Sequence, residues 1–229
     1  MSIRLTGISS MATKGLLAEL AAMYRDHAGV DVAFESVGGV DAARRVLCGE
    51  AFDVVVLADD AIDRLTAGGA VDATGKTALV RSNVAVAVPA GAAHPDIGTP
   101  DALRDAVVRA RRVGYSTGPS GVALVQLFDR WGIGAQLSDR LMQAPPGVPV
   151  ASLVAAGDVD LGFQQLSELM HADGIEVVGS LPPGVQVVTT FCAARCRSSS
   201  QHEAVSALLA FLGSPATEAA KRRHGMLPG

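Results

Sequence analysis

The chain has 229 residues, a hydrophobic content of 49% and a formal net charge of -4. This size allows a full apolar core and suits one large domain or two small ones. The basic residues are scattered, which excludes the basic surface that nucleic-acid binding needs, and no apolar run reaches the ~18 residues that span a membrane.

Strand and helix patterns alternate in the first part of the chain. Strands are predicted at 2–6, 30–34 and 52–57, and after each one a loop leads to apolar residues at helical spacing. Three such units in succession predict right-handed crossovers and a parallel sheet. Residues 58–60 are expected to cap a helix that begins near Ala61.

A second set of elements begins near residue 83, and the chain finally returns to the first set. The expected strands are 83–88, 113–115, 159–163 and 185–191, and the expected helices are one starting at 99–101, then 122–131, 150–156, 201–212 and 215–224. No low-complexity linker separates the two sets. Crossing strands should therefore join two lobes, one made of 1–80 plus 190–229 and the other of 81–189.

Three loops follow predicted parallel strands and precede helices. They contain Ser9 and Ser10, then Ser36, Gly38 and Gly39, and lastly Ser116, Ser120 and Gly121. Ligands of open α/β sheets bind at this edge, where helix N-termini present unpaired N–H groups. A single serine there is more commonly a helix cap. Three such loops together predict an anion-binding site of hydroxyl groups and backbone amides.

The order of these motifs resembles the molybdate-binding type of the periplasmic-binding-protein type II superfamily. The resemblance rests on Ser9-Ser10, Ser36, and the segments 52–59, 118–121, 157–163 and 211–216. It covers nearly the whole chain and implies an α/β fold of two lobes. Each lobe would be a mainly parallel sheet flanked by helices, with the ligand in the cleft between the lobes. In that family a tyrosine lies in the segment that follows the strand at 157–163. This chain has Gln164-Gln165-Leu166-Ser167-Glu168 there, which counts against molybdate.

Positively charged side chains bear on whether the ligand is a bare oxyanion or a carboxylate. A polycarboxylate is best held by bidentate arginine, and Arg81, followed by Ser82, precedes the crossing strand at the expected hinge. A solvated loop arginine is an equal alternative. Lys14, Arg44 and Arg45 lie on helices whose N-termini should face the cleft, although such residues are more commonly solvated.

The segment 162–169 resembles a branch of the superfamily that includes aconitate isomerase, which interconverts trans- and cis-aconitate. This resemblance implies an alternative function in the same cleft, a proton shift across an allylic tricarboxylate. The weak acid/base candidates are Glu168, His171 and Tyr115, and for His171 an exposed helix end is the favoured interpretation. No nucleophile elbow, P-loop or metal motif is present, so no cofactor is expected.

The main hypothesis is a solute-binding protein for a small anion, either an oxyanion or a di- or tricarboxylate, that closes at a hinge. A weaker hypothesis is an intracellular ligand-sensing domain. No export signal precedes the first strand, which predicts a cytoplasmic protein. A trimmed mature form would be periplasmic and could have an ABC permease as its partner. The spacing of Cys48, Cys192 and Cys196 predicts neither disulfides nor a zinc site.

Overall fold

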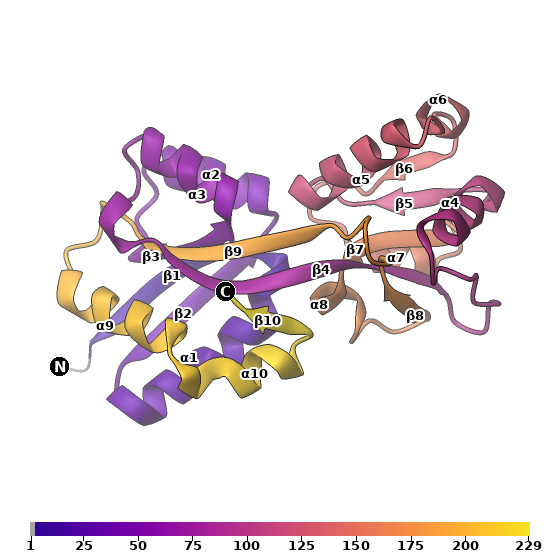
Figure 1. Ribbon diagram of the computed structural model, residues 1–229. Helices are drawn as coiled ribbons and strands as arrows, with labels where there is room; N and C mark the ends of the chain where they lie inside the picture. The colour runs from indigo at the N-terminus through magenta and orange to yellow at the C-terminus, as the bar shows by residue number, and fades with distance from the viewer. Residues whose placement is uncertain (1–2) are drawn as a thin grey trace. The chain divides into compact units, whose positions relative to one another are not determined.

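The computed structural model describes residues 3–229 and has an α/β architecture of mixed sheets with flanking helices (Figure 1). Contacts divide it into two compact units. Unit 1 runs to Ser82 and resumes at Thr190–Gly229, and unit 2 is Asn83–Thr189. Two strands, β4 (Thr77–Pro89) and β9 (Val188–Arg195), carry the chain from one unit to the other.

The sheet of unit 1 has the strand order β2-β1-β3-β9-β4, in which β1 (Arg4–Ser10) is parallel to both β2 (Asp31–Val37) and β3 (Val54–Ala58). This confirms the predicted parallel arrangement. Strand β9 is antiparallel to β3, and β10 (Met226–Pro228) is antiparallel to β4.

Helices cover both faces of this sheet (Figure 1). One face carries α1 (Lys14–Ala28), α9 (His202–Gly213) and α10 (Glu218–Arg223), and the other carries α2 (Gly39–Leu47) and α3 (Asp59–Ala67). Strand β3 is buried throughout. Val54 and Val56 pack on the face that α1, α9 and α10 cover, and Val55 and Leu57 pack on the face that α2 and α3 cover. A run of apolar residues is what a strand covered on both faces requires. Short 3-10 turns lie at Met11–Thr13, Ala73–Gly75 and Pro215–Thr217.

Unit 2 has the strand order β4-β7-β5-β6, and β8 (Ile175–Ser180) pairs with β4. Strand β5 (Val113–Tyr115) is parallel to β6 (Leu141–Gln143) and to β7 (Leu161–Gln165). The main core packs the sheet against α4 (Pro100–Arg109), α5 (Pro119–Arg130) and α6 (Gly134–Leu137). Helices α7 (Val150–Ala155) and α8 (Leu166–Leu169) pack in smaller clusters that include Ala85 and Ala87 of β4.

Several expected boundaries were wrong. Strands β1 and β2 continue to Ser10 and Val37, so their serines end strands and do not begin loops. Helix α3 begins at Asp59, which together with Asp60 lies in its first turn and does not cap it. Carboxylates in that turn face the positive end of the helix dipole. Thr99 does cap α4, because its Oγ1 accepts the Ala102 N–H at 3.1 Å.

Other elements had no counterpart in the sequence prediction. These are β6, β8, β10, α6 and α8, all of six residues or fewer. Their apolar patterns are too short to give a period. Part of the first predicted strand, Ser2, lies outside the described residues. Within 3–229, no helix is both long enough and apolar enough to cross a membrane.

Candidate functional site

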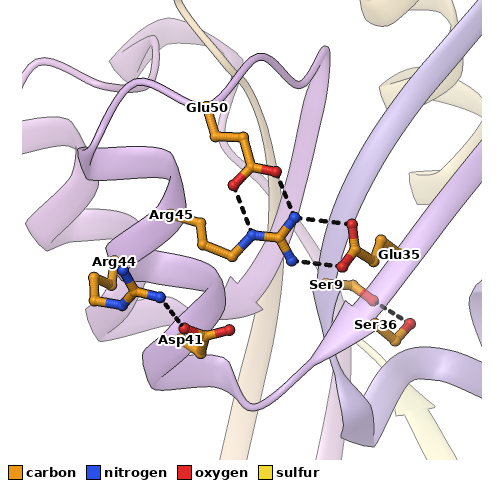
Figure 2. Close-up of polar contacts among 7 residues, drawn as sticks. All are labelled: Ser9, Glu35, Ser36, Asp41, Arg44, Arg45 and Glu50. Carbon is orange, nitrogen blue, oxygen red and sulfur yellow. Dashed lines mark hydrogen bonds and ion pairs between the residues drawn. The ribbon is translucent and has the colours of Figure 1, made fainter.

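Ser9 and Ser36 bring two hydroxyl groups together where parallel strands end in unit 1. They are partners in the register of β1 and β2, and their Oγ atoms are 2.8 Å apart (Figure 2). Ser9 is fully buried and Ser36 is half-buried. Ser9 Oγ also lies 3.3 Å from the Ser10 carbonyl oxygen, to which it can donate its single proton. The hydroxyl proton of Ser36 is therefore free for a ligand in the arrangement in which Ser9 donates to Ser36 instead.

Ser10 lies beside the start of helix α2. Its Oγ accepts the Ala12 N–H at 3.2 Å, which leaves the hydroxyl proton of Ser10 as a possible donor. A Cβ atom on Gly39 would be 3.8 Å from Cβ of Ser10, so the first turn of α2 adjoins this serine. No side chain of the described residues caps α2 at Gly38. The first N–H groups of the helix are therefore left for solvent or an anion.

A groove between α1 and β2 adds positive charge near these hydroxyls. Lys14 and Arg25 of α1 line it together with Phe34 and Ser36 of β2, and Asp31 of β2 adds one carboxylate against these two cations. Lys14, the first residue of α1, is exposed, as the sequence pattern favoured, and it lines this groove together with Ser36. An ammonium group in this groove favours a negatively charged ligand over a neutral one.

Arg45 is occupied by carboxylates within unit 1. Figure 2 shows its guanidinium between Glu35 and Glu50, with Nη1 2.5 Å from Glu35 Oε1 and Nε 2.7 Å from Glu50 Oε2. The hydrogen bonds to Glu50 and Glu35 raise the pKa of Arg45 further above its ordinary value. These contacts hold the guanidinium on carboxylates of unit 1 and count against the weak prediction that Arg45 binds the ligand. Arg44 bonds Asp41 in the same way.

In unit 2, the loop after β5 holds a second pair of hydroxyls. Ser116 Oγ and Ser120 Oγ are 3.2 Å apart, and Ser120 lies in the first turn of α5. A Cβ atom added to Gly121 would be only 1.9 Å from the Ser116 carbonyl oxygen. Glycine is therefore required where the helix meets the loop, and this close approach holds both hydroxyls at the helix N-terminus.

The end of β7 lies at the same edge, because Tyr115 and Phe163 are partners in the parallel β5–β7 pair. Gln164 is buried, and its Oε1 accepts the Val150 N–H at 2.9 Å while its Nε2 donates to Glu168 Oε1 at 2.8 Å. Burial raises the pKa of Glu168 to about 7, and the Gln164 hydrogen bond opposes part of that rise. Glu168 is thus a carboxyl group suited to proton transfer near neutral pH.

Gln165 was missed by the sequence reasoning. It is buried, its Nε2 donates to Thr189 Oγ1 at 2.8 Å, and its Oε1 has no hydrogen-bond partner in the described part of the chain. A buried polar atom without a partner is uncommon in a folded protein. The one available signal was its position directly after Gln164, at the end of a buried strand.

Four further candidates are Arg81, Ser82, Tyr115 and His171. Arg81 is exposed on β4, and its Nε donates to the Pro228 carbonyl at 3.3 Å. Ser82 is fully buried, and its Oγ has no partner among residues 3–229. Tyr115 is half-buried at the end of β5, and His171 is exposed two residues beyond α8. Of these four residues, Tyr115 alone ends a parallel strand at the edge that carries Glu168.

Comparison with known protein families identifies the family to which the chain belongs. A family model described as "Bacterial extracellular solute-binding protein" matches residues 5–227. The chain belongs to this family. Among curated proteins, this solute-binding protein is 36% identical over 230 residues to an aconitate isomerase from Pseudomonas sp, covering 98% of the chain and 87% of the relative.

Solved structures agree with that family in fold. The periplasmic molybdate-binding protein of Azotobacter vinelandii matches with a TM-score of 0.81 at 19% identity, covering 97% of this chain and 98% of its own. The sulfate-binding protein SubI of Mycobacterium tuberculosis H37Rv matches with a TM-score of 0.80 at 16% identity, covering 99% and 87%. The solute-binding protein therefore has the periplasmic-binding-protein type II fold that the order of its motifs predicted.

Proposed function

We propose that this chain binds a small anion, either an oxyanion or a di- or tricarboxylate. The observation that carries the proposal is the 2.8 Å contact between Ser9 Oγ and Ser36 Oγ at the ends of parallel strands, beside the N-terminus of α2. Hydroxyl protons and helix amides are donors, and a group of donors suits an anion. Membership of the solute-binding family supports the same function.

The residues predicted from the sequence stay the proposed ligand-binding residues of each unit. They are Ser9, Ser10, Ser36, Gly38, Gly39, Arg81 and Ser82 in unit 1, and Ser116, Ser120, Gly121 and Gln164 in unit 2. Gln164 would act through Glu168, because its side-chain amide is held by Val150 and Glu168. We also propose that an exported form of the chain works in the periplasm with an ABC permease, as its family suggests.

Replacing Ser36 by alanine should weaken anion binding. The change removes the half-buried member of the hydroxyl pair. One lost hydrogen bond to an anion corresponds to an about tenfold rise in Kd. Thermal shift with molybdate, tungstate, sulfate, citrate and both aconitates identifies the ligand, and calorimetry then measures Kd. The control is Ser206→Ala, because Ser206 is exposed on α9 and its hydroxyl donates to the His202 carbonyl oxygen of the same helix. Equal Kd values for the two variants would contradict the role of Ser36.

A second candidate function is the isomerisation of aconitate, favoured by the 36% identity to an aconitate isomerase. In that reaction a base removes a proton from the methylene carbon of trans-aconitate. The electron pair then shifts the double bond, and a proton is added to the former vinyl carbon. No oxidant or cofactor is consumed. A carboxyl group that titrates near neutral pH, as Glu168 does, can serve both proton transfers.

If the isomerase hypothesis holds, the protein converts trans-aconitate to cis-aconitate, and Glu168→Gln reduces turnover roughly 100-fold or more, the usual contribution of an acid/base group. Proton NMR of the reaction mixture measures both isomers. Arg81→Ala tests the proposed carboxylate anchor and should abolish turnover, which would also argue against a pure receptor. Stabilisation by molybdate with no turnover of aconitate would eliminate the isomerase and leave the binding function.

A further inference from the structure

Glu168 lies at the edge of unit 2 where three parallel strands end. The C-terminal ends of β5, β6 and β7 meet there, since β5 is parallel to both of its neighbours. The helices α5, α7 and α8 follow these three strands in the chain. Glu168 belongs to α8, and Ser116 and Ser120 occupy the loop after β5 at the same edge.

The surroundings of Glu168 supply a fixed donor and no positive charge. Gln164 Nε2 donates to its Oε1 at 2.8 Å, and Gln164 is itself held by the Val150 N–H of α7. Across the described residues, Glu168 takes part in no ion pair within 4.0 Å. The carboxylate of Glu168 is half-buried, and burial of its charged form costs free energy. One hydrogen bond from a neutral amide therefore has to offset this cost.

The titratable side chains on the neighbouring elements form no ion pair with Glu168 in the described part of the chain. Neither α7 nor β7 carries a titratable side chain. Strand β8 contributes Glu176, which is occupied by the Gly91 N–H at 2.9 Å and by His94 Nε2 at 2.8 Å. In the turn after α8, His171 is exposed. A second negative charge that arrived at this edge would thus meet a carboxylate that no ion pair within 4.0 Å offsets among residues 3–229.

An anion and an ionised carboxylate at one edge repel each other, and the repulsion favours the protonated form of the carboxyl group. The protonated form can also donate a hydrogen bond to the anion. We propose that Glu168 takes up one proton from solvent when an anion binds at this edge of unit 2. This inference rests on the proposed anion binding. It adds that the main bound species is the anion together with a neutral Glu168, and that a reacting aconitate loses its proton in the minor complex in which Glu168 is ionised.

The consequence is that affinity falls as pH rises. Burial sets the pKa of Glu168 to about 7 in the free protein, so proton uptake becomes costly above neutral pH. If one proton is taken up, linkage makes Kd for sulfate rise roughly 25-fold from about pH 6.5 to about pH 8.5. Sulfate is the appropriate probe because it stays fully ionised throughout this range, and trans-aconitate serves as the carboxylate probe.

The experiment is calorimetric titration of the full chain with sulfate and with trans-aconitate across that pH range. Wild-type protein and the control Glu176→Gln should both show the roughly 25-fold change, whereas Glu168→Gln should change less than about threefold because its side chain cannot titrate. Equal slopes for the wild type and Glu168→Gln would overturn proton uptake while leaving anion binding intact. Failure of every protein to bind either probe at any pH would overturn the proposed function, and this inference with it.

Discussion

Replacement of Gly121 by alanine is expected to destabilise unit 2 by roughly 3 kcal/mol and to abolish anion binding there. The new Cβ atom would be 1.9 Å from the Ser116 carbonyl oxygen and 3.1 Å from Cδ2 of Tyr115. Because the first contact is with backbone, no side-chain rotation can relieve it. The loop must move away from α5, and the contact between Ser116 and Ser120 is lost with it.

Gly118 provides a matched control in the same loop. A Cβ atom there would meet no heavy atom within 4 Å, and its φ of -80° suits any residue. Gly118→Ala should therefore keep both stability and binding. The fluorescence of Trp131, the one tryptophan of the chain, reports urea unfolding directly beyond the C-terminal end of α5. If both variants unfolded at the same urea concentration as wild type, the loop would be more compliant than its geometry indicates.

The second large effect is a pH-dependent gain in stability from Glu168→Gln. Burial raises the pKa of Glu168 from 4.5 to about 7, so the folded protein holds this proton more tightly than the unfolded chain. Because of this raised pKa, Glu168 takes no unfolding free energy from the protein at low pH, where it is protonated in both states. The loss of unfolding free energy grows as pH rises towards 7 and is complete above that. Relative to wild type, the variant should gain about 2.5 kcal/mol in unfolding free energy between about pH 5 and about pH 8.

Urea unfolding followed by Trp131 fluorescence measures this difference in unit 2. Glu50→Gln is a suitable control because the hydrogen bonds from Arg45 lower the pKa of Glu50, so this group stays ionised throughout that range. Its effect on stability should be the same at both pH values. A gain for Glu168→Gln that did not change with pH would mean that Glu168 is already ionised at about pH 5, in conflict with its burial.

The core elements were predictable because their residues repeat a simple pattern. Strand β3 is a run of apolar residues, and its alternating contacts follow from burial on both faces. The two units divide at Ser82 and Asn83 and again at Thr189 and Thr190, inside long strands and without a flexible linker. The order of motifs predicted the family, because these segments keep their order over nearly the whole chain.

The polar contacts were less predictable because they depend on which side chains the fold brings together. Residue types and loop positions pointed to Ser9 and Ser36, yet their 2.8 Å contact depends on the register of β1 with β2. Gln164 was expected to contact the ligand, whereas the structure uses its amide to join Val150 to Glu168. Arg45 was considered as a ligand residue, but its partners Glu35 and Glu50 are distant enough in sequence to give no local signal.

The interrupted sequence of unit 1 also determines when each part of the molecule can fold during synthesis. Unit 2 is one continuous segment, Asn83–Thr189, so the ribosome completes it before unit 1. Strand β9, which lies between β3 and β4 in the sheet, and the helices α9 and α10 all come from the last part of the chain. Until these residues emerge, β3 is paired with β1 alone and lacks β9 on its other side, and the apolar residues that pack on α9 stay uncovered. A nascent chain stalled before Thr190 would therefore carry a complete unit 2 beside an open sheet edge, the kind of surface that chaperones protect.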